Sequence, residues 1–236
     1  MKYIAAALAA LALSIPAQAK LHIYEFTASV SQLAHLEAFE YAQRVGGIRE
    51  GSVISLGDSI VGRFSYDTSI ASTSNSGQHD PTSPTTIYYY PETASATNFL
   101  NFTILPSGQT IGTGGTETKR VMQVGDSNAG GLNGTDVLWI ANQGGNAFGS
   151  FGISLASTSA DWITNGKLPE ALSFSDFGRT SVYHNFIRDD GHRIMLDARL
   201  TSLTEITVTA VPEPGTWALM LAGLGILGLS TRRQRG

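Results

Sequence analysis

The sequence predicts a mainly β protein whose exported region folds as a β-sandwich or a jelly roll. Three observations support this fold class. Short segments rich in β-branched and aromatic residues recur at intervals of roughly ten residues, separated by Gly, Pro, Asn and Asp. The chain has 26 Gly, and Ser and Thr make up roughly a fifth of its 236 residues, which disfavours a helix bundle. Hydrophobic residues account for 42% of the chain, which is too many for a disordered protein.

Residues 1–19 are predicted to be a signal peptide that forms an apolar helix. Lys2 supplies the positive charge at its start, and residues 4–15 are apolar, mostly Ala and Leu. Ala17-Gln18-Ala19 has the small residues that are typical of a cleavage site. We therefore expect cleavage between Ala19 and Lys20 and export of the chain that begins at Lys20.

The exported region, residues 20–210, contains ten segments with the composition of strands. Turn residues separate them: Gly57-Asp58 follows the second segment, and Pro106-Ser107-Gly108 follows the fifth. Glycines inside the segments, such as Gly62, indicate bulges or tight corners. We expect the strands to form two packed sheets. The predicted strands are residues 22–30, 52–56, 59–66, 86–90, 96–105, 119–124, 136–141, 148–155, 181–187 and 192–209.

One stretch of the exported region predicts a helix instead. Ser31 is a suitable N-cap for residues 31–45, where hydrophobic residues such as Leu33 and Leu36 recur partly at helical spacing, and Gly46-Gly47 provides a stop. Residues 68–86 consist largely of Ser, Thr, Asn, Gly and Pro. We expect them to form an exposed loop.

The C-terminal segment, residues 211–236, has three consecutive parts. Pro212-Glu213-Pro214 interrupts regular structure, because each proline fixes φ and lacks an N–H donor. Residues 217–229 are apolar and uncharged, which predicts a membrane helix, although at 1.5 Å per residue they cover about 20 Å of a hydrocarbon core roughly 30 Å thick. An arginine cluster follows, and such a cluster holds its end of a membrane helix in the cytoplasm.

A Pro-Glu-Pro sequence, a short apolar helix with glycines and an arginine cluster, in this order, resemble the C-terminal tail of PEP-CTERM proteins. The resemblance implies a sorting signal of Gram-negative bacteria, in which the helix anchors the chain transiently in the inner membrane until an exosortase cuts near Pro-Glu-Pro. It also implies that the protein then reaches the cell surface or the extracellular matrix. The sorting residues would be Pro212, Glu213, Pro214, Arg232, Arg233 and Arg235.

Three segments of the exported region also resemble PEP-CTERM proteins: residues 61–68 (Val-Gly-Arg-Phe-Ser-Tyr-Asp-Thr), Lys167-Leu168-Pro169 and residues 200–204. The resemblance implies a β-sandwich without an assigned active site. It therefore favours a surface or matrix protein that is structural or binds a ligand such as a glycan, with exopolysaccharide as the candidate partner.

Composition excludes several classes of protein. The chain has no Cys, so disulfide scaffolds, cysteine nucleophiles and thiolate zinc sites are excluded. Residues 20–210 contain 11 Lys and Arg against 18 Asp and Glu, and this net charge of −7 argues against binding to nucleic acid. The five His lack the spacing of zinc enzymes. We therefore assign no catalytic residue, metal or cofactor.

A serine esterase of the GDSL type is the alternative from another class. Gly57-Asp58-Ser59-Ile60 resembles the nucleophile block of those enzymes, and Asp189 and His192 fit their Asp-x-x-His sequence. Ser59 is expected to lie in a strand rather than at the start of a helix, however, and no sequence supplies the oxyanion donor. A hairpin turn at Gly57-Asp58 accounts for the same residues.

Two further features each carry a ligand hypothesis. Residues 125–136 are rich in the oxygen ligands that calcium prefers, but their spacing departs from an EF-hand at Gly130 and Val137, so a glycine loop is the alternative. Tyr88-Tyr89-Tyr90 should alternate between the faces of a strand. At least one ring then points outward, where it could stack on a sugar or pack against a neighbouring strand.

Overall fold

The computed structural model describes residues 21–72, 74–76, 85–90, 99–112, 118–127, 135–144, 149–164, 166–188 and 190–206. The predicted signal peptide and the entire C-terminal tail, including all six predicted sorting residues, lie outside this set. No helix within the described part of the chain is long and apolar enough to cross a membrane.

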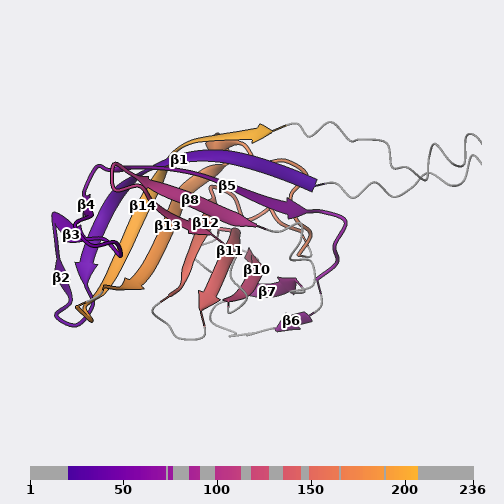
Figure 1. The fold of residues 1–236 in the computed structure, drawn as a ribbon. Helices are drawn as coiled ribbons and strands as arrows, with labels where there is room; N and C mark the ends of the chain where they lie inside the picture. The colour runs from indigo at the N-terminus through magenta and orange to yellow at the C-terminus, as the bar shows by residue number, and fades with distance from the viewer. Residues whose placement is uncertain are drawn as a thin grey trace, which may run out of the picture. The chain divides into compact units, whose positions relative to one another are not determined.

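Strands dominate the described residues, so the prediction of a mainly β protein is confirmed (Figure 1). Twelve of the described strands form one antiparallel sheet in the order β6-β7-β10-β11-β12-β13-β14-β1-β5-β8-β9, with β2 paired to β1, and β3 and β4 form a separate ribbon. The strands are β1 (Leu21–His35), β2 (Glu40–Tyr41), β3 (Arg44–Gly46), β4 (Val53–Ser55), β5 (Ser59–Asp67), β6 (Ser74–Ser76), β7 (Thr85–Tyr90), β8 (Leu100–Leu105), β9 (Gln109–Gly112), β10 (Thr118–Ser127), β11 (Val137–Gly144), β12 (Phe151–Ser157), β13 (Phe177–Ile187) and β14 (Arg193–Ile206).

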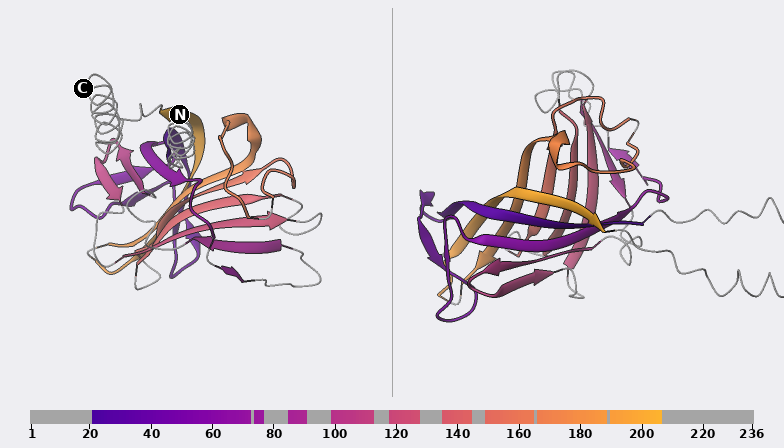
Figure 2. Two further views of the ribbon diagram at one scale, coloured as in Figure 1. Left: turned by 90° about the vertical axis from the view of Figure 1, so that its right-hand side faces the viewer. Right: turned by 90° about the horizontal axis from the view of Figure 1, so that it is seen from above.

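The long sheet bends over itself at β1 and β14. Figure 2 shows β1, β5 and β8 running across the direction of β11, β12 and β13. The register between β1 and β14 shifts between Thr27 and Ala28 and again between Val30 and Gln32, and such bulges bend a strand and increase its twist. The prediction of two separate packed sheets is therefore wrong for the described residues, because the two layers are halves of one continuous sheet.

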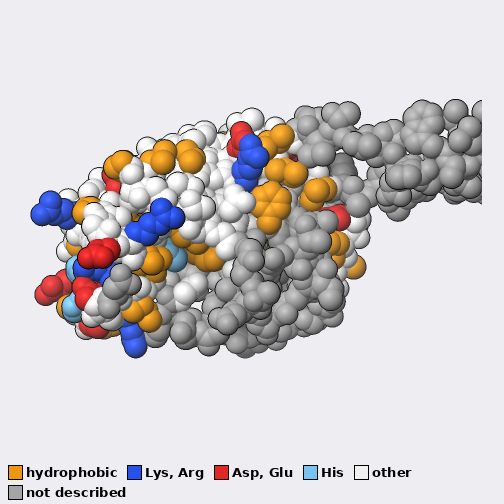
Figure 3. All heavy atoms as spheres, in the orientation of Figure 1, with side chains coloured by type: hydrophobic (Ala, Val, Ile, Leu, Met, Phe, Trp, Pro, Cys, Tyr) orange, Lys and Arg blue, Asp and Glu red, His pale blue; other side chains and the backbone are white. Residues whose placement is uncertain are grey.

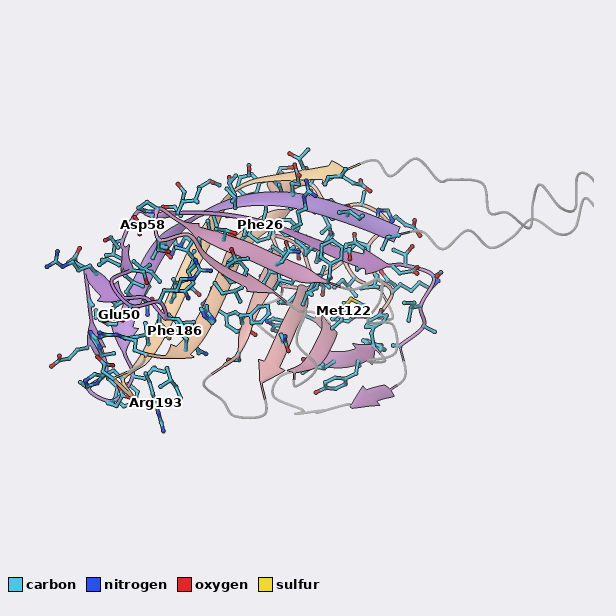
Figure 4. All side chains as sticks on the ribbon, viewed as in Figure 1. Phe26, Glu50, Asp58, Met122, Phe186 and Arg193 are labelled. Atoms are coloured by element: carbon cyan, nitrogen blue, oxygen red, sulfur yellow. The ribbon has the colours of Figure 1, made fainter. Side chains whose placement is uncertain are left out.

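The core lies on the inner face of the bent sheet. Phe26 of β1, Met122 of β10 and Phe186 of β13 belong to one buried cluster and project into the space that the sheet encloses (Figure 4). Rings from the two halves meet there: the ring centroids of Phe102 on β8 and Phe151 on β12 are 6.0 Å apart, edge to face. This arrangement suits the quadrupoles of the two rings and holds the halves together.

Gly62 lies where two aromatic side chains pack closely. On β5 it pairs with Phe26 on one side and with Phe102 on the other, and the register is regular through both pairs. A Cβ atom at Gly62 would lie 2.4 Å from Cζ of Phe26 and 2.6 Å from the carbonyl oxygen of Asn101. The glycine therefore makes room for ring packing, and the predicted bulge or corner at Gly62 is wrong.

The predicted helix over residues 31–45 is also wrong. Ser31 to His35 continue β1, β2 turns back onto β1, and β3 pairs with β4. β14 offers the backbone of β1 a row of hydrogen-bonding partners, and the strand buries Leu33 completely. Phe39, one of the residues at helical spacing, is 84% exposed and has a φ of 51°. Within the described residues the one helical element is a 3₁₀ turn, η3 (Phe174–Asp176).

The remaining predicted elements agree with the structure. Each of the ten predicted strand segments overlaps a described strand, usually within a few residues at either end. Four short strands, β2, β3, β6 and β9, were not predicted. β6 lies within the predicted loop at residues 68–86, most of which is outside the described residues or in turns.

Candidate ligand-binding groove

A groove of about 650 Å³ opens on the outer face of β11, β12 and β13. Trp139, Ser154 and Ser181 lie side by side across it, because Trp139 pairs with Ser154 and Ser154 pairs with Ser181. Paired residues of antiparallel strands place their side chains on the same face. Leu138 and Ile140, which flank Trp139, are buried in the core. Trp139 therefore points away from the core and into the groove.

Small residues of β12 form the floor of the groove. Ser154 and Ala156 line the groove and alternate with core residues of this strand, so the floor is low between β11 and β13. Tyr183 of β13 lies over Gly152, where a Cβ atom would be only 2.6 Å from the Tyr183 ring and hydroxyl. Burial raises the pKa of Tyr183. Its hydroxyl therefore keeps its proton at neutral pH and can donate a hydrogen bond at this end of the groove.

The opposite end of the groove is polar. Arg179 is exposed there and pairs with Ala156, just as Tyr183 pairs with Gly152 at the first end. Its guanidinium offers a planar set of donors. Beside it, Ser181 donates a hydrogen bond to the carboxylate of Asp197. Burial raises the pKa of Asp197, while this hydrogen bond and the charge of Arg179 oppose the shift.

Three tyrosine hydroxyls fasten the loop of residues 158–173 to the sheet. The bonded pairs are Tyr24 Oη with the N–H of Leu172 (2.9 Å), Tyr66 Oη with the carbonyl oxygen of Pro169 (3.0 Å), and Tyr90 Oη with the carbonyl oxygen of Gly166. We call Tyr24, Tyr66 and Tyr90 the tyrosine clasp. The loop begins at Thr158, which lines the groove and is held by a 2.9 Å hydrogen bond from its N–H to the carbonyl oxygen of Asp176.

A second hollow, of about 570 Å³, lies over the outer face of β1, β5 and β8. Arg63 and Glu25 form an ion pair across it, with 2.8 Å between Nε and Oε1, so their charges cancel at an exposed position. Phe26 is the aromatic residue among those that line this hollow, and it is buried. The partly exposed Trp139 and Tyr183 thus distinguish the first groove, which we take as the candidate site.

Ser59 and His192, the residues of the esterase alternative, are not brought together. Ser59 begins β5 and pairs with Ser29 of β1. The His192 ring instead lies near that of His35, the last residue of β1, with 6.3 Å between the ring centroids. Six residues of strand separate Ser29 from His35, which is about 20 Å along β1. Asp189 is outside the described residues, so the described residues form no nucleophile–base pair from this motif.

Gly57 and Asp58 form the predicted turn. Gly57 has a φ of 87°, and Oδ2 of Asp58 accepts a 2.8 Å hydrogen bond from the N–H of Ser55. The prediction of a hairpin is wrong, however, because β4 pairs with β3 while β5 pairs with β1 and β8. The aspartate of the esterase-like block thus has a structural role in the turn.

Charged side chains gather at the end of the molecule where His192 lies. Figure 3 shows them near β2, β3 and β4, and Figure 4 places Glu50 and Arg193 at this end. Glu37 accepts a 2.8 Å hydrogen bond from the backbone N–H of Arg193. The described residues contain no group of three His, Asp or Glu that could hold a metal ion.

The predicted calcium loop, residues 125–136, is described only at its two ends. Asp136 is buried, and its carboxylate accepts hydrogen bonds from the N–H of Ser127 (2.8 Å) and of Ile163 (2.6 Å). Burial raises the pKa of Asp136, while these two bonds oppose the shift. The carboxylate therefore bonds both to β10 and to the segment that contains Ile163, and calcium binding by residues 125–136 stays a prediction.

The three consecutive tyrosines of β7 alternate between faces as predicted. Tyr88 and Tyr90 pair with the core residues Val124 and Met122. Tyr89 pairs with Gln123, which pairs on its other side with Trp139. Tyr89 is therefore the outward tyrosine, on the same face of the sheet as Trp139.

Sequence analysis did not single out Trp139, Tyr183 or Arg179 as site residues. One signal was available: Trp139 stands between Leu138 and Ile140 in a predicted strand, so period-two alternation places it outward. Its position opposite small residues of another strand depends on the register between strands, which alternation within one strand does not determine.

The comparisons with known proteins concern the tail. Residues 210–234 match the PEP-CTERM protein-sorting motif. This range contains Pro212, Glu213, Pro214, Arg232 and Arg233, so the predicted resemblance is confirmed for the tail. No curated protein and no solved structure gives a significant match to the chain.

Proposed function

We propose that this PEP-CTERM chain, exported and sorted by an exosortase, acts at the cell surface or in the extracellular matrix as a glycan-binding protein. Export and sorting follow from the motif at residues 210–234. Glycan binding is assigned to the groove on β11, β12 and β13, and exopolysaccharide is the proposed natural ligand. Transient anchoring in the inner membrane by residues 217–229 is part of the same proposal.

The observation that carries glycan binding is the pairing of aromatic and polar groups over a floor of small residues. A sugar ring has apolar C–H faces and a rim of hydroxyls. Trp139 offers a partly exposed aromatic face, while Ser154 and Arg179 offer hydrogen-bonding groups within the same groove. A concave, mostly preformed site with few polar groups is the usual form of a small-ligand site.

Binding of the purified full chain to an array of bacterial and plant glycans tests the proposal, followed by titration calorimetry with the glycans that bind. Trp139→Ala should weaken binding at least tenfold, since a stacked ring contributes about 1 kcal/mol beyond its buried area. Val61→Ala, in the second hollow, is the matched control and should leave affinity unchanged. Equal affinity of the Trp139→Ala chain and the unaltered chain would refute the assignment of the groove.

We also propose that the domain has no hydrolase activity. The separation of Ser59 from His192 along β1 supports this, because a serine nucleophile needs its base within hydrogen-bonding distance.

A further inference from the structure

The groove is part of a longer row of side chains on the outer face of the sheet. Pairing places Tyr89 opposite Gln123, Gln123 opposite Trp139, Trp139 opposite Ser154, and Ser154 opposite Ser181. The row crosses five neighbouring strands, β7, β10, β11, β12 and β13. We call Tyr89, Gln123, Trp139, Ser154 and Ser181 the cross-strand row.

In the first three positions of the cross-strand row, the aromatic rings of Tyr89 and Trp139 lie on either side of the amide of Gln123. Adjacent strands are about 4.8 Å apart, so Tyr89 and Trp139 are separated by about 10 Å and the whole row extends over about 20 Å. The Gln123 amide, which can both donate and accept, lies between the two rings. On the other side of Trp139, Ser154 and Ser181 add hydroxyls at successive strand spacings.

Four of the positions beside the cross-strand row are small, while Ile87 and Val137 in the same flanking row are larger. Gly125 and Ala156 lie in the neighbouring row on one side, and Ala141 and Gly152 lie in the neighbouring row on the other. These four residues rise little above the backbone, so the larger side chains of the row have space along their length. Arg179 and Tyr183 stand at the two ends of the groove on β13 rather than in the row.

No member of the cross-strand row carries a charge. The row therefore suits a neutral chain of sugars better than a strongly anionic one, in agreement with the net charge of −7 over residues 20–210. Two rings about 10 Å apart match a flat, ribbon-like polysaccharide in which every second sugar presents the same face. The sugar between them would lie over Gln123.

We infer that the site binds an extended, neutral polysaccharide that runs across the strands from Ser181 to Tyr89, rather than a single sugar or a disaccharide held at Trp139. This inference rests on the proposed glycan-binding function and adds the length, direction and class of the ligand. Its distinguishing feature is that Tyr89, two strands away from Trp139, contacts only ligands long enough to reach it.

The test measures affinity as a function of oligosaccharide length. The purified full chain is titrated with cellulose-derived and chitin-derived oligosaccharides of two, four and six sugars. We expect affinity to rise at least tenfold from two sugars to six. Tyr89→Ala should remove most of that gain and leave the affinity for two sugars unchanged, whereas Trp139→Ala should weaken binding of every length.

Two further variants keep the test independent of folding. Tyr89→Phe retains the ring and should restore the length dependence that Tyr89→Ala loses. Tyr41→Ala removes a tyrosine that is 78% exposed and lies outside the row, so it should bind as the unaltered chain does. If six sugars bind no better than two, or if Tyr89→Ala keeps the length dependence, the inference is overturned while glycan binding stands. If no oligosaccharide or glycan binds, the proposed function fails as well.

Discussion

The hydroxyl of Tyr66 donates a 3.0 Å hydrogen bond to the backbone carbonyl oxygen of Pro169. This bond joins residues 61–68 to Lys167-Leu168-Pro169, two of the three segments for which the sequence predicts a resemblance to PEP-CTERM proteins. The Tyr66 ring also stacks on Tyr24, a second member of the tyrosine clasp, with 5.9 Å between the ring centroids. Residues 61–68 and Lys167-Leu168-Pro169 therefore meet in the folded domain, where the Tyr66 bond helps to hold the loop of residues 158–173 against the sheet.

Tyr66→Phe should lower the free energy of unfolding by about 1–2 kcal/mol, because the Pro169 carbonyl oxygen loses its partner while the ring packing is kept. Urea denaturation of the purified full chain measures this. Tyr41→Phe is the control, since that side chain is 78% exposed and its hydroxyl can bond to water. Equal losses for both variants would show that the clasp bond adds no stability.

His184 should make the stability of the domain depend on pH. Its ring lies among Phe102, Phe151 and Phe186, and burial lowers its pKa from 6.5 to about 4, with the backbone of Ser150 opposing the shift. Between these values the unfolded chain binds a proton that the folded chain excludes, so acid favours unfolding. Neutral His184 therefore adds about 3 kcal/mol to the free energy of unfolding above pH 6.5, and this contribution is lost as the pH falls toward 4.

Urea denaturation at pH 7, 6, 5 and 4 measures this loss. His184→Phe keeps a ring in the aromatic cluster and should reduce the decline in stability over that range. His192→Phe, at an exposed turn, is the control and should leave the decline in place. A His184→Phe chain with the same pH dependence as the unaltered chain would show that other groups cause the decline.

Gly62→Ala should destabilise the domain by about 1–3 kcal/mol, the usual cost of an overpacked core. The added Cβ would lie 2.6 Å from the carbonyl oxygen of Asn101, and this backbone atom cannot rotate away. Gly112→Ala on β9 is the matched control, because the nearest atom to its added Cβ would be the Cβ of Asn101, at 3.2 Å. Thermal unfolding should give the Gly112→Ala chain a clearly higher midpoint temperature than the Gly62→Ala chain. A higher midpoint for Gly62→Ala would contradict the predicted overpacking at Gly62.

Period-two alternation and turn residues were enough to predict most of the strands. Alternation identifies the inward residues of a strand, such as Leu138 and Ile140 around Trp139, because burial follows the two faces directly. It does not tell which strand lies beside which. The continuity of the sheet around the bend depends on the bulges at Thr27 and Val30, which no local pattern reveals.

The helix predicted over residues 31–45 was wrong for a related reason. The spacing of Leu33 and Leu36 fits a short helix as well as a strand end, and local propensity cannot weigh the backbone hydrogen bonds that β14 offers. The candidate site was missed because it depends on the register between β11, β12 and β13. Tyr89 was recognised as one of three tyrosines, but its alignment with Trp139 through Gln123 exists only in the folded sheet.

The domain should not hydrolyse esters. The rate of ester hydrolysis measured with the unaltered chain should therefore be the same with the Ser59→Ala and His192→Ala chains. Ser59 lies beside the middle of β1 and His192 beside its end at His35, about 20 Å further along the strand, so one cannot take a proton from the other. Release of nitrophenol from a short-chain nitrophenyl ester measures this. Turnover that both substitutions abolish would show that the two residues cooperate after all.

Replacing Pro212, Glu213 and Pro214 together by Ala should leave the protein in the inner membrane and uncut. The apolar residues 217–229 and the three arginines remain in this variant, so anchoring persists, while the sequence that resembles the exosortase recognition site is gone.

Replacing Arg232, Arg233 and Arg235 by Gln should have a different effect, because arginines beside an apolar helix resist translocation. That variant should lose its stable membrane position and be sorted poorly. Cell fractionation combined with a size assay separates the two results, with the unaltered chain in a strain lacking the exosortase as the control. If the alanine variant is cut and released like the unaltered chain, the Pro-Glu-Pro sequence is not the processing signal, and the tail acts only as an anchor.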